Sequence, residues 1–157
     1  MISFIIYTHS SRSNNLIQTI KALEENELNL IAEIIIVFQD NIDVVLNSRF
    51  FIKKHFLDIE TYKKPLMCNI GISLASYPII VLLDSDRILP KNYFYDNCLK
   101  IQKKEIITTK YLRQYKKNGS SFIEERSLTN EINCKNLFAV NTMLWKEDWI
   151  SADESFV

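Results

Sequence analysis

The chain has 157 residues and a formal net charge of zero, with 19 Lys and Arg residues against 19 Asp and Glu residues. This length suits one domain, and a composition that is 47% apolar is enough to bury a core. Zero net charge argues against general nucleic-acid binding, which requires a basic face. The chain has two glycines, Gly71 and Gly119, and therefore lacks a glycine-rich phosphate loop of either the Walker or the GxGxxG type.

Three cysteines, Cys68, Cys98 and Cys134, are widely spaced and form no CxxC pair. This pattern indicates reduced thiols rather than a zinc site or a disulfide framework. Residues 1–10 lack the basic start of a secretory signal, and no apolar run approaches the ~20 residues of a membrane span. We therefore expect a cytoplasmic protein.

Apolar runs alternate with amphipathic segments along the first part of the chain. Residues 2–8 are rich in Ile and Phe and predict a strand, and apolar residues at helical spacing predict a helix over 13–27. The β-branched run 31–38 is typical of a strand buried on both faces. An apolar stripe favours a helix over 44–56, and residues 59–62 favour a short strand.

The second part of the chain continues this alternation. Pro65 suits the first turn of a helix that runs to about residue 76, and the run after Pro78 predicts a strand that ends at Asp84. The remaining expected elements are a helix over 90–104, a hairpin of strands 106–115 and 121–125, a strand over 137–145 and a helical turn over 146–150. Alternating strands and helices predict an α/β fold with a mainly parallel sheet flanked by helices.

Polar clusters follow three of the predicted strands: Thr8-His9-Ser10, Gln39-Asp40 and Asp84-Ser85-Asp86. In open α/β sheets, ligands bind in the crevice beyond the carboxyl ends of the strands. The three clusters therefore predict a binding crevice at that edge of the sheet.

Asp84 and Asp86 are two carboxylates placed directly after a predicted buried strand. Burying either charge without a partner would be costly. One alternative is a solvated Asx-type turn. The other is a hard divalent cation that the carboxylate oxygens hold, with open coordination positions for a diphosphate. Oxygen ligands favour Mn²⁺ or Mg²⁺ over zinc.

Several segments together resemble the GT-A glycosyltransferases. The resemblance is strongest to the inverting family-two type, which includes bacterial polysaccharide and O-antigen transferases, and some features resemble galactosyltransferases. The hydrophobic run that ends in D-S-D at 80–86 matches the family's h-h-h-h-D-x-D stretch. The other segments that carry the resemblance are I-I-Y-T-H-S at 5–10, E-I-I-I-V at 33–37, K-P-L-M-C-N-I-G at 64–71 and N-T-M-L-W-K-E-D at 141–148.

This resemblance implies a Rossmann-like GT-A domain that binds a nucleotide-sugar, expected to be a UDP-sugar, together with Mn²⁺ or Mg²⁺. The metal ligands that it implies are Asp84 and Asp86. The nucleotide-sugar-binding residues that it implies are Thr8, His9, Gln39, Asp40, Lys64, Asn69, Asp84 and Ser85. Lys64 would supply the charge that is lost where Cys68 replaces the arginine of many members. The implied reaction transfers the sugar, with inversion, to a hydroxyl of a saccharide or lipid-linked acceptor in polysaccharide biosynthesis.

The family's usual general base belongs to a carboxylate pair that normally follows a segment resembled here by residues 151–156. We therefore expect residues 1–157 to form a single domain that is truncated at its C-terminus relative to the family. Asp153 and Glu154 are then the late carboxylates that could act as the base.

Other functions stay open. The chain could be a degenerate, non-catalytic module that binds a nucleotide-sugar. The segment 82–88 also loosely fits the phosphatase motif of haloacid dehalogenases, in which Asp84 would be a nucleophile. The basic run 110–117 could face a lipid-linked acceptor or a membrane surface, or form a solvated hairpin. Trp145 and Trp149 could form an acceptor platform, pack in the core or contribute to an oligomer contact.

Overall fold

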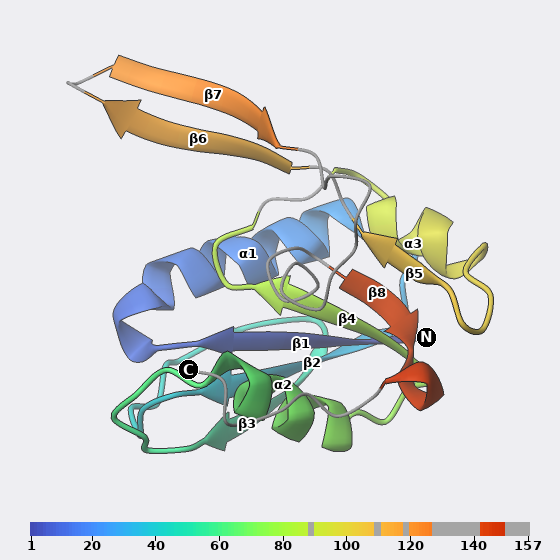
Figure 1. Cartoon of the computed structure of the whole chain (residues 1–157), viewed down its shortest axis with the longest axis horizontal. Helices are drawn as coiled ribbons and strands as arrows, with labels where there is room; N and C mark the ends of the chain where they lie inside the picture. Colours follow the sequence, from blue (N-terminus) through green and yellow to red (C-terminus); the bar gives the residue numbers. More distant parts are fainter. Residues whose placement is uncertain (88–89, 109–110, 118–119, 127–141, 150–157) are drawn as a thin grey trace.

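The structure, a computed structural model, describes residues 1–87, 90–108, 111–117, 120–126 and 142–149. It contains a six-stranded sheet with the strand order β3-β2-β1-β4-β8-β5 and a separate two-stranded sheet, β6-β7 (Figure 1). The strands are β1 (Ile2–Thr8), β2 (Ala32–Phe38), β3 (Phe51–Phe56), β4 (Ile79–Asp84), β5 (Ile106–Thr108), β6 (Tyr111–Lys117), β7 (Ser120–Arg126) and β8 (Thr142–Trp145). The helices are α1 (Ser13–Asn26), α2 (Lys64–Ser73) and α3 (Tyr93–Cys98), with 3-10 turns η1 (Ser10–Arg12) and η2 (Lys146–Asp148).

The sheet is mostly parallel. Strands β1 to β4 run in one direction, and β8 is antiparallel to both β4 and β5. The predicted α/β class and mainly parallel sheet are therefore confirmed. β1 and β2 are buried along their whole length, which explains why their sequences are continuous apolar runs rather than alternating ones.

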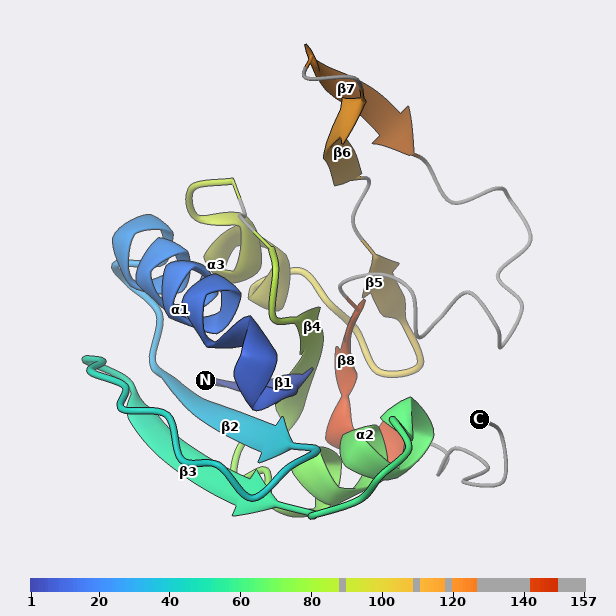
Figure 2. The ribbon, with the colours of Figure 1, turned by 90° about the vertical axis from the view of Figure 1, so that its left-hand side faces the viewer.

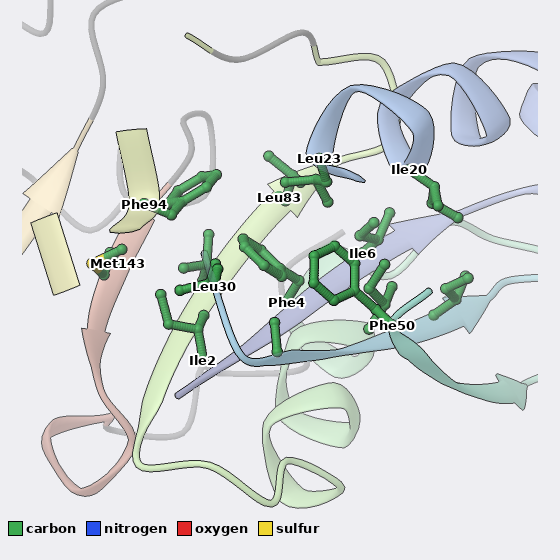
Figure 3. Packing of buried hydrophobic residues seen from close by; sticks show 14 of the residues in the cluster. Ile2, Phe4, Ile6, Ile20, Leu23, Leu30, Phe50, Leu83, Phe94 and Met143 are labelled. Atoms are coloured by element: carbon green, nitrogen blue, oxygen red, sulfur yellow. The ribbon is translucent and has the colours of Figure 1, made fainter. Parts of the chain in front are cut away.

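Helices cover both faces of the sheet. Figure 2 shows α1 and α3 on one face and α2 on the other. Side chains of alternating strand residues fill the two layers, with Phe4 and Ile6 facing α1 and α3, and Ile5 and Tyr7 facing α2. Phe4 meets Phe94 of α3 edge to face, with ring centroids 5.0 Å apart (Figure 3). Burial of side chains of this size stabilises the fold by about 1.5–3 kcal/mol each.

The helix expected over 44–56 is wrong. Residues 51–56 form β3, which pairs in parallel with β2 at the edge of the sheet. Successive lysines point to opposite sides of this strand, where Lys53 pairs with the buried Glu33 at 2.9 Å and Lys54 donates to the Val44 carbonyl. These charged side chains make the edge strand look unlike the central strands, which is why its sequence did not predict a strand.

Two smaller expectations are also wrong. The helix expected over 90–104 spans only Tyr93–Cys98, and it begins after Asn92, whose backbone is left-handed. Residues 59–62 form no strand, and the carbonyls of Ile59 and Glu60 accept hydrogen bonds from the Gln39 side chain. The predicted hairpin is present as β6 and β7, but its first strand begins at Tyr111 rather than at residue 106, because Ile106–Thr108 form β5 and pair with β8 in the main sheet. Residues 137–141 of the last expected strand lie outside the described residues.

Within the described part of the chain, no helix has the length and apolar character needed to cross a membrane.

Gly71 allows α2 to approach β1 closely. A methyl group at this buried position would overlap Cγ2 of Ile5 and touch Val37.

We expect Gly71→Ala to destabilise the chain by about 1–3 kcal/mol through overpacking, although alanine favours a helix more than glycine does. Urea unfolding measures the change. Ser73→Ala, at an exposed position of the same helix, is the control and should cost under about 0.5 kcal/mol. Equal stability of Gly71→Ala and the wild type would contradict this packing.

Candidate functional site

The carboxyl ends of β2, β1 and β4 lie side by side. Thr8 is opposite Phe38 in the parallel register, and Tyr7 is opposite Asp84. The polar clusters that follow these strands meet directly, because the Thr8 hydroxyl donates to Ser85 Oγ at 3.1 Å and the Ser10 backbone N–H donates to Asp40 Oδ1 at 3.0 Å. The structure thus brings the three clusters together at one edge of the sheet.

Asp84 lies at the centre of an ion-pair cluster. Lys64 Nζ, from the first turn of α2, is 3.0 Å from Asp84 Oδ1, and Arg87 Nη2 donates to Oδ2 at 2.8 Å. The Lys64 ammonium also lies 4.5 Å from the centroid of the Tyr7 ring, a cation–π contact. Each of the three charged side chains is about one-fifth exposed, so both cations can still meet a ligand.

The cations around Asp84 keep it ionised. Burial alone would raise the pKa of its carboxyl, but the charge of Lys64 and hydrogen bonds from Arg87, Tyr7 and Lys64 outweigh burial and lower the pKa below its usual value. Burial and the nearby Asp84 charge raise the pKa of the Tyr7 hydroxyl well above its usual value. Tyr7 therefore remains a neutral donor beside the carboxylate.

Asp86 differs from Asp84 in exposure. Its side chain is 45% exposed, and Oδ1 lies 3.5 Å from Arg87 Nε. Its carboxylate oxygens suit a hard cation, whereas both oxygens of Asp84 already have cationic partners. Among the described residues, no three Asp, Glu, His or Cys side chains converge on one point. The donor set fits a Mg²⁺ or Mn²⁺ that takes one protein carboxylate and completes its shell with phosphate oxygens and water.

His9 and Asp40 shape the loop after β1. His9 Nδ1 accepts from the Ser11 backbone N–H at 3.1 Å and so caps η1, and its Nε2 lies 3.7 Å from Asp40 Oδ2. Asp40 also accepts from the Ser10 hydroxyl. Burial alone would raise the pKa of Asp40, but hydrogen bonds from Ser10 and the proximity of His9 lower it below its usual value. His9 and Asp40 are partly exposed at this edge of the sheet.

Four other predicted binding residues have side chains that are buried or hydrogen-bonded within the protein. Thr8 and Ser85 are each 2% exposed and hydrogen-bond to each other. The Gln39 amide, which was expected to bind the nucleotide-sugar, donates to the two carbonyls described above and holds the 59–60 segment. Asn69 on α2 accepts from the indole of Trp149 at 3.2 Å.

Trp145 and Trp149, the tryptophans near the end of the chain, lie in different parts of the core. Trp145 packs against the core layer on the α1 face of the sheet, whereas Trp149 packs against the layer on the α2 face. A joint acceptor platform of these two tryptophans is therefore wrong, because the sheet lies between them. Asp153 and Glu154, the predicted base candidates, lie outside the described residues.

Thr19 is a site residue that the sequence did not predict. This α1 residue is 1% exposed, and its hydroxyl donates to the Ser85 carbonyl at 2.9 Å and accepts from the Arg87 backbone N–H at 3.0 Å. The sequence feature that could have indicated this role is a hydroxyl residue on the apolar face of the helix, next to Leu16 and Ile20. A separate hollow, lined by Pro78, Lys103, Trp145, Lys146 and Glu147, lies at the opposite end of β4 from Asp84.

No protein-family model and no curated protein matches the chain. Among solved structures, the chain is similar to Staphylococcus aureus TarS 1–349, with 15% identity, a TM-score of 0.49 and coverage of 62% of this chain and 31% of that one. A second S. aureus TarS structure has 19% identity, a TM-score of 0.48 and coverage of 62% of this chain and 19% of that one. TarS 1–349 in complex with UDP has 17% identity, a TM-score of 0.46 and coverage of 62% of this chain and 31% of that one. The chain thus spans about a third or less of the length of these structures, and likeness at this level does not identify a function.

The pKa of Asp84 predicts a pH-dependent contribution to stability. Asp84→Asn leaves Lys64 without its carboxylate partner and leaves Arg87 with Asp86 at 3.5 Å, and we expect a cost of about 1–3 kcal/mol at pH 7, between the values for exposed and fully buried pairs. Because the folded-state pKa is lowered, the contribution is complete above the unfolded pKa of about 3.9 and is lost as the pH falls through the folded value.

Urea unfolding from pH 7 down to pH 3 measures this difference between the wild type and Asp84→Asn. Asp96→Asn, on the exposed side of α3, is the matched control and should unfold nearly like the wild type at every pH. A difference between the wild type and Asp84→Asn that does not shrink in acid would contradict the ion-pair assignment.

Proposed function

We propose that the chain is the donor-binding part of a glycosyltransferase and binds a nucleoside diphosphate sugar beyond the carboxyl ends of β1 and β4. The observation that carries this proposal is the cluster of Lys64, Arg87 and Asp84 with the more exposed Asp86 beside it. The place is the one at which ligands bind in open α/β sheets. The cluster also combines cationic donors for phosphate with a carboxylate for a metal.

Charge balance supports a metal-bound nucleotide as the ligand. Lys64 and Arg87 balance Asp84 and Asp86, so the cluster carries no surplus positive charge. A diphosphate diester adds about two negative charges, which a divalent cation would neutralise. Asp86 would hold Mn²⁺ or Mg²⁺ through its exposed carboxylate, and the metal would stabilise the charge of the departing diphosphate. Asp84 was predicted as a second metal ligand, and in this proposal it would instead orient the two cations with which its oxygens pair.

Residues around the crevice have separate roles in this proposal. Lys64 and Arg87, which contact different carboxylate oxygens of Asp84, would donate hydrogen bonds to phosphate oxygens. His9 and Asp40, at the ends of the neighbouring strands, lie on the side where the nucleoside would bind. Thr8, Gln39 and Ser85 act through the backbone that they hold, because their side chains are buried.

Transfer would require an acceptor hydroxyl and a base. The acceptor oxygen would form a bond to the anomeric carbon while the bond from that carbon to the diphosphate breaks, which inverts the configuration. The hydroxyl proton would pass to a carboxylate within hydrogen-bond reach, and Asp153 or Glu154 is the candidate in this chain. A saccharide or lipid-linked acceptor remains the proposed partner.

Calorimetry with UDP tests donor binding. UDP is the nucleotide in one of the TarS structures and is the probe that the sequence favours. We expect the wild type to bind UDP in Mn²⁺, and Asp86→Ala to weaken that binding about tenfold or more because the proposed metal ligand is removed. Asp96→Ala removes an exposed carboxylate from α3 and is the matched control, which should bind like the wild type. Absence of binding by the wild type, or equal binding by Asp86→Ala, would refute the proposal.

The alternatives predict other results with the same protein. A non-catalytic module binds UDP in Mn²⁺ but releases none from a panel of UDP-sugars, with or without an acceptor. A transferase releases UDP slowly from its own donor by hydrolysis. A phosphatase of the haloacid-dehalogenase type cleaves an aryl phosphate and loses that activity in Asp84→Asn.

A further inference from the structure

Thr19 places a hydroxyl where α1 should present only apolar groups. Its neighbours on the buried stripe of α1 are Leu16, Ile20 and Leu23, all of which are at most 2% exposed. Burying a hydroxyl costs free energy unless hydrogen bonds replace those with water. Both hydrogen bonds of Thr19 go to one target, the turn after β4, through the Ser85 carbonyl and the Arg87 N–H.

This turn carries the charges of the proposed site. Thr19 holds it from the α1 face, and the Thr8 hydroxyl holds Ser85 through its side chain. The bond from the Arg87 N–H to Thr19 Oγ1 fixes the backbone from which the guanidinium reaches Asp84. Asp86 lies between the two residues that Thr19 contacts, so its backbone is bracketed by both hydrogen bonds.

We infer that Thr19 is a positioning residue for the anion and metal site, and that it sets the affinity for the metal-bound nucleotide through Arg87 and Asp86. The inference rests on the proposed function for its ligand. Thr19 does not touch the ligand in this account. Its hydroxyl holds the turn in a conformation in which Arg87 contacts Asp84 and the Asp86 carboxylate is exposed.

Three variants separate positioning from general stability. Thr19→Val keeps the shape of the side chain but removes the hydroxyl, and Thr19→Ser restores the hydroxyl. Ile20→Val removes a buried methylene from the adjacent position of α1, which has no hydrogen bond to the turn, and is the control for a weakened helix.

Two measurements on the full chain test the inference. Calorimetry with UDP in Mn²⁺ should show a dissociation constant raised about tenfold in Thr19→Val, and within about twofold of the wild type in Thr19→Ser and Ile20→Val. Amide hydrogen exchange should show that the Arg87 N–H loses protection in Thr19→Val, beyond any loss shared by all amides, and keeps it in the other two variants.

The outcomes distinguish the two proposals. Unchanged protection of the Arg87 amide in Thr19→Val, or UDP affinity equal to that of the wild type, would overturn the positioning role. The same holds if Ile20→Val weakens UDP binding as much as Thr19→Val does. A wild type that binds no UDP in Mn²⁺ overturns both the proposed function and the ligand-affinity role of Thr19, whereas loss of binding confined to Thr19→Val supports both.

Discussion

The structure depends on the pairing of the Asp84 carboxylate, at the end of a buried strand, with two cationic side chains. Asp84 follows five buried residues of β4 and lies opposite Tyr7 in the centre of the sheet. A charge there is stable only with close partners, and two come from different elements: Lys64 from α2 and Arg87 from the turn after β4. The cluster therefore ties the first turn of α2 to the end of β4. It also concentrates two cations at the edge of the sheet where an anion would bind.

Both faces of the sheet contribute to this arrangement. On one face, Gly71 lets α2 pack closely against Ile5, which brings Lys64 over the end of the sheet. On the other face, Thr19 of α1 holds the turn that carries Arg87. The other end of the sheet buries its carboxylate differently. There Glu33 has hydrogen bonds from Ser3 and Ser76 and an ion pair with Lys53, at 3% exposure. Asp86 is by contrast 45% exposed, and its proposed role is to hold the metal.

The sequence predicted those parts of the fold that depend on local pattern. β1, β2 and β4 are apolar runs because both of their faces are buried, and Asp84 ends the last of them as expected. The edge strand β3 was not predicted because the placement of its lysines and of the exposed Phe51 depends on neighbouring elements of the fold. Tertiary packing also decided that Trp145 and Trp149, four residues apart, lie on opposite faces. Neither the double pairing of Asp84 nor the role of Thr19 could be predicted. The residues in these contacts are 3 to 68 positions apart and belong to separate elements, so the contacts depend on how those elements pack.

A crystal structure of the chain grown with UDP and Mn²⁺ tests the central claim most directly. The account predicts a diphosphate beyond the ends of β1 and β4, within hydrogen-bond distance of Lys64 and Arg87, and a metal ion that bridges it to the Asp86 carboxylate. Nucleotide bound elsewhere, for example in the hollow beside Trp145 at the opposite end of β4, would contradict the account. A metal ion held without Asp86 would contradict the role assigned to that residue.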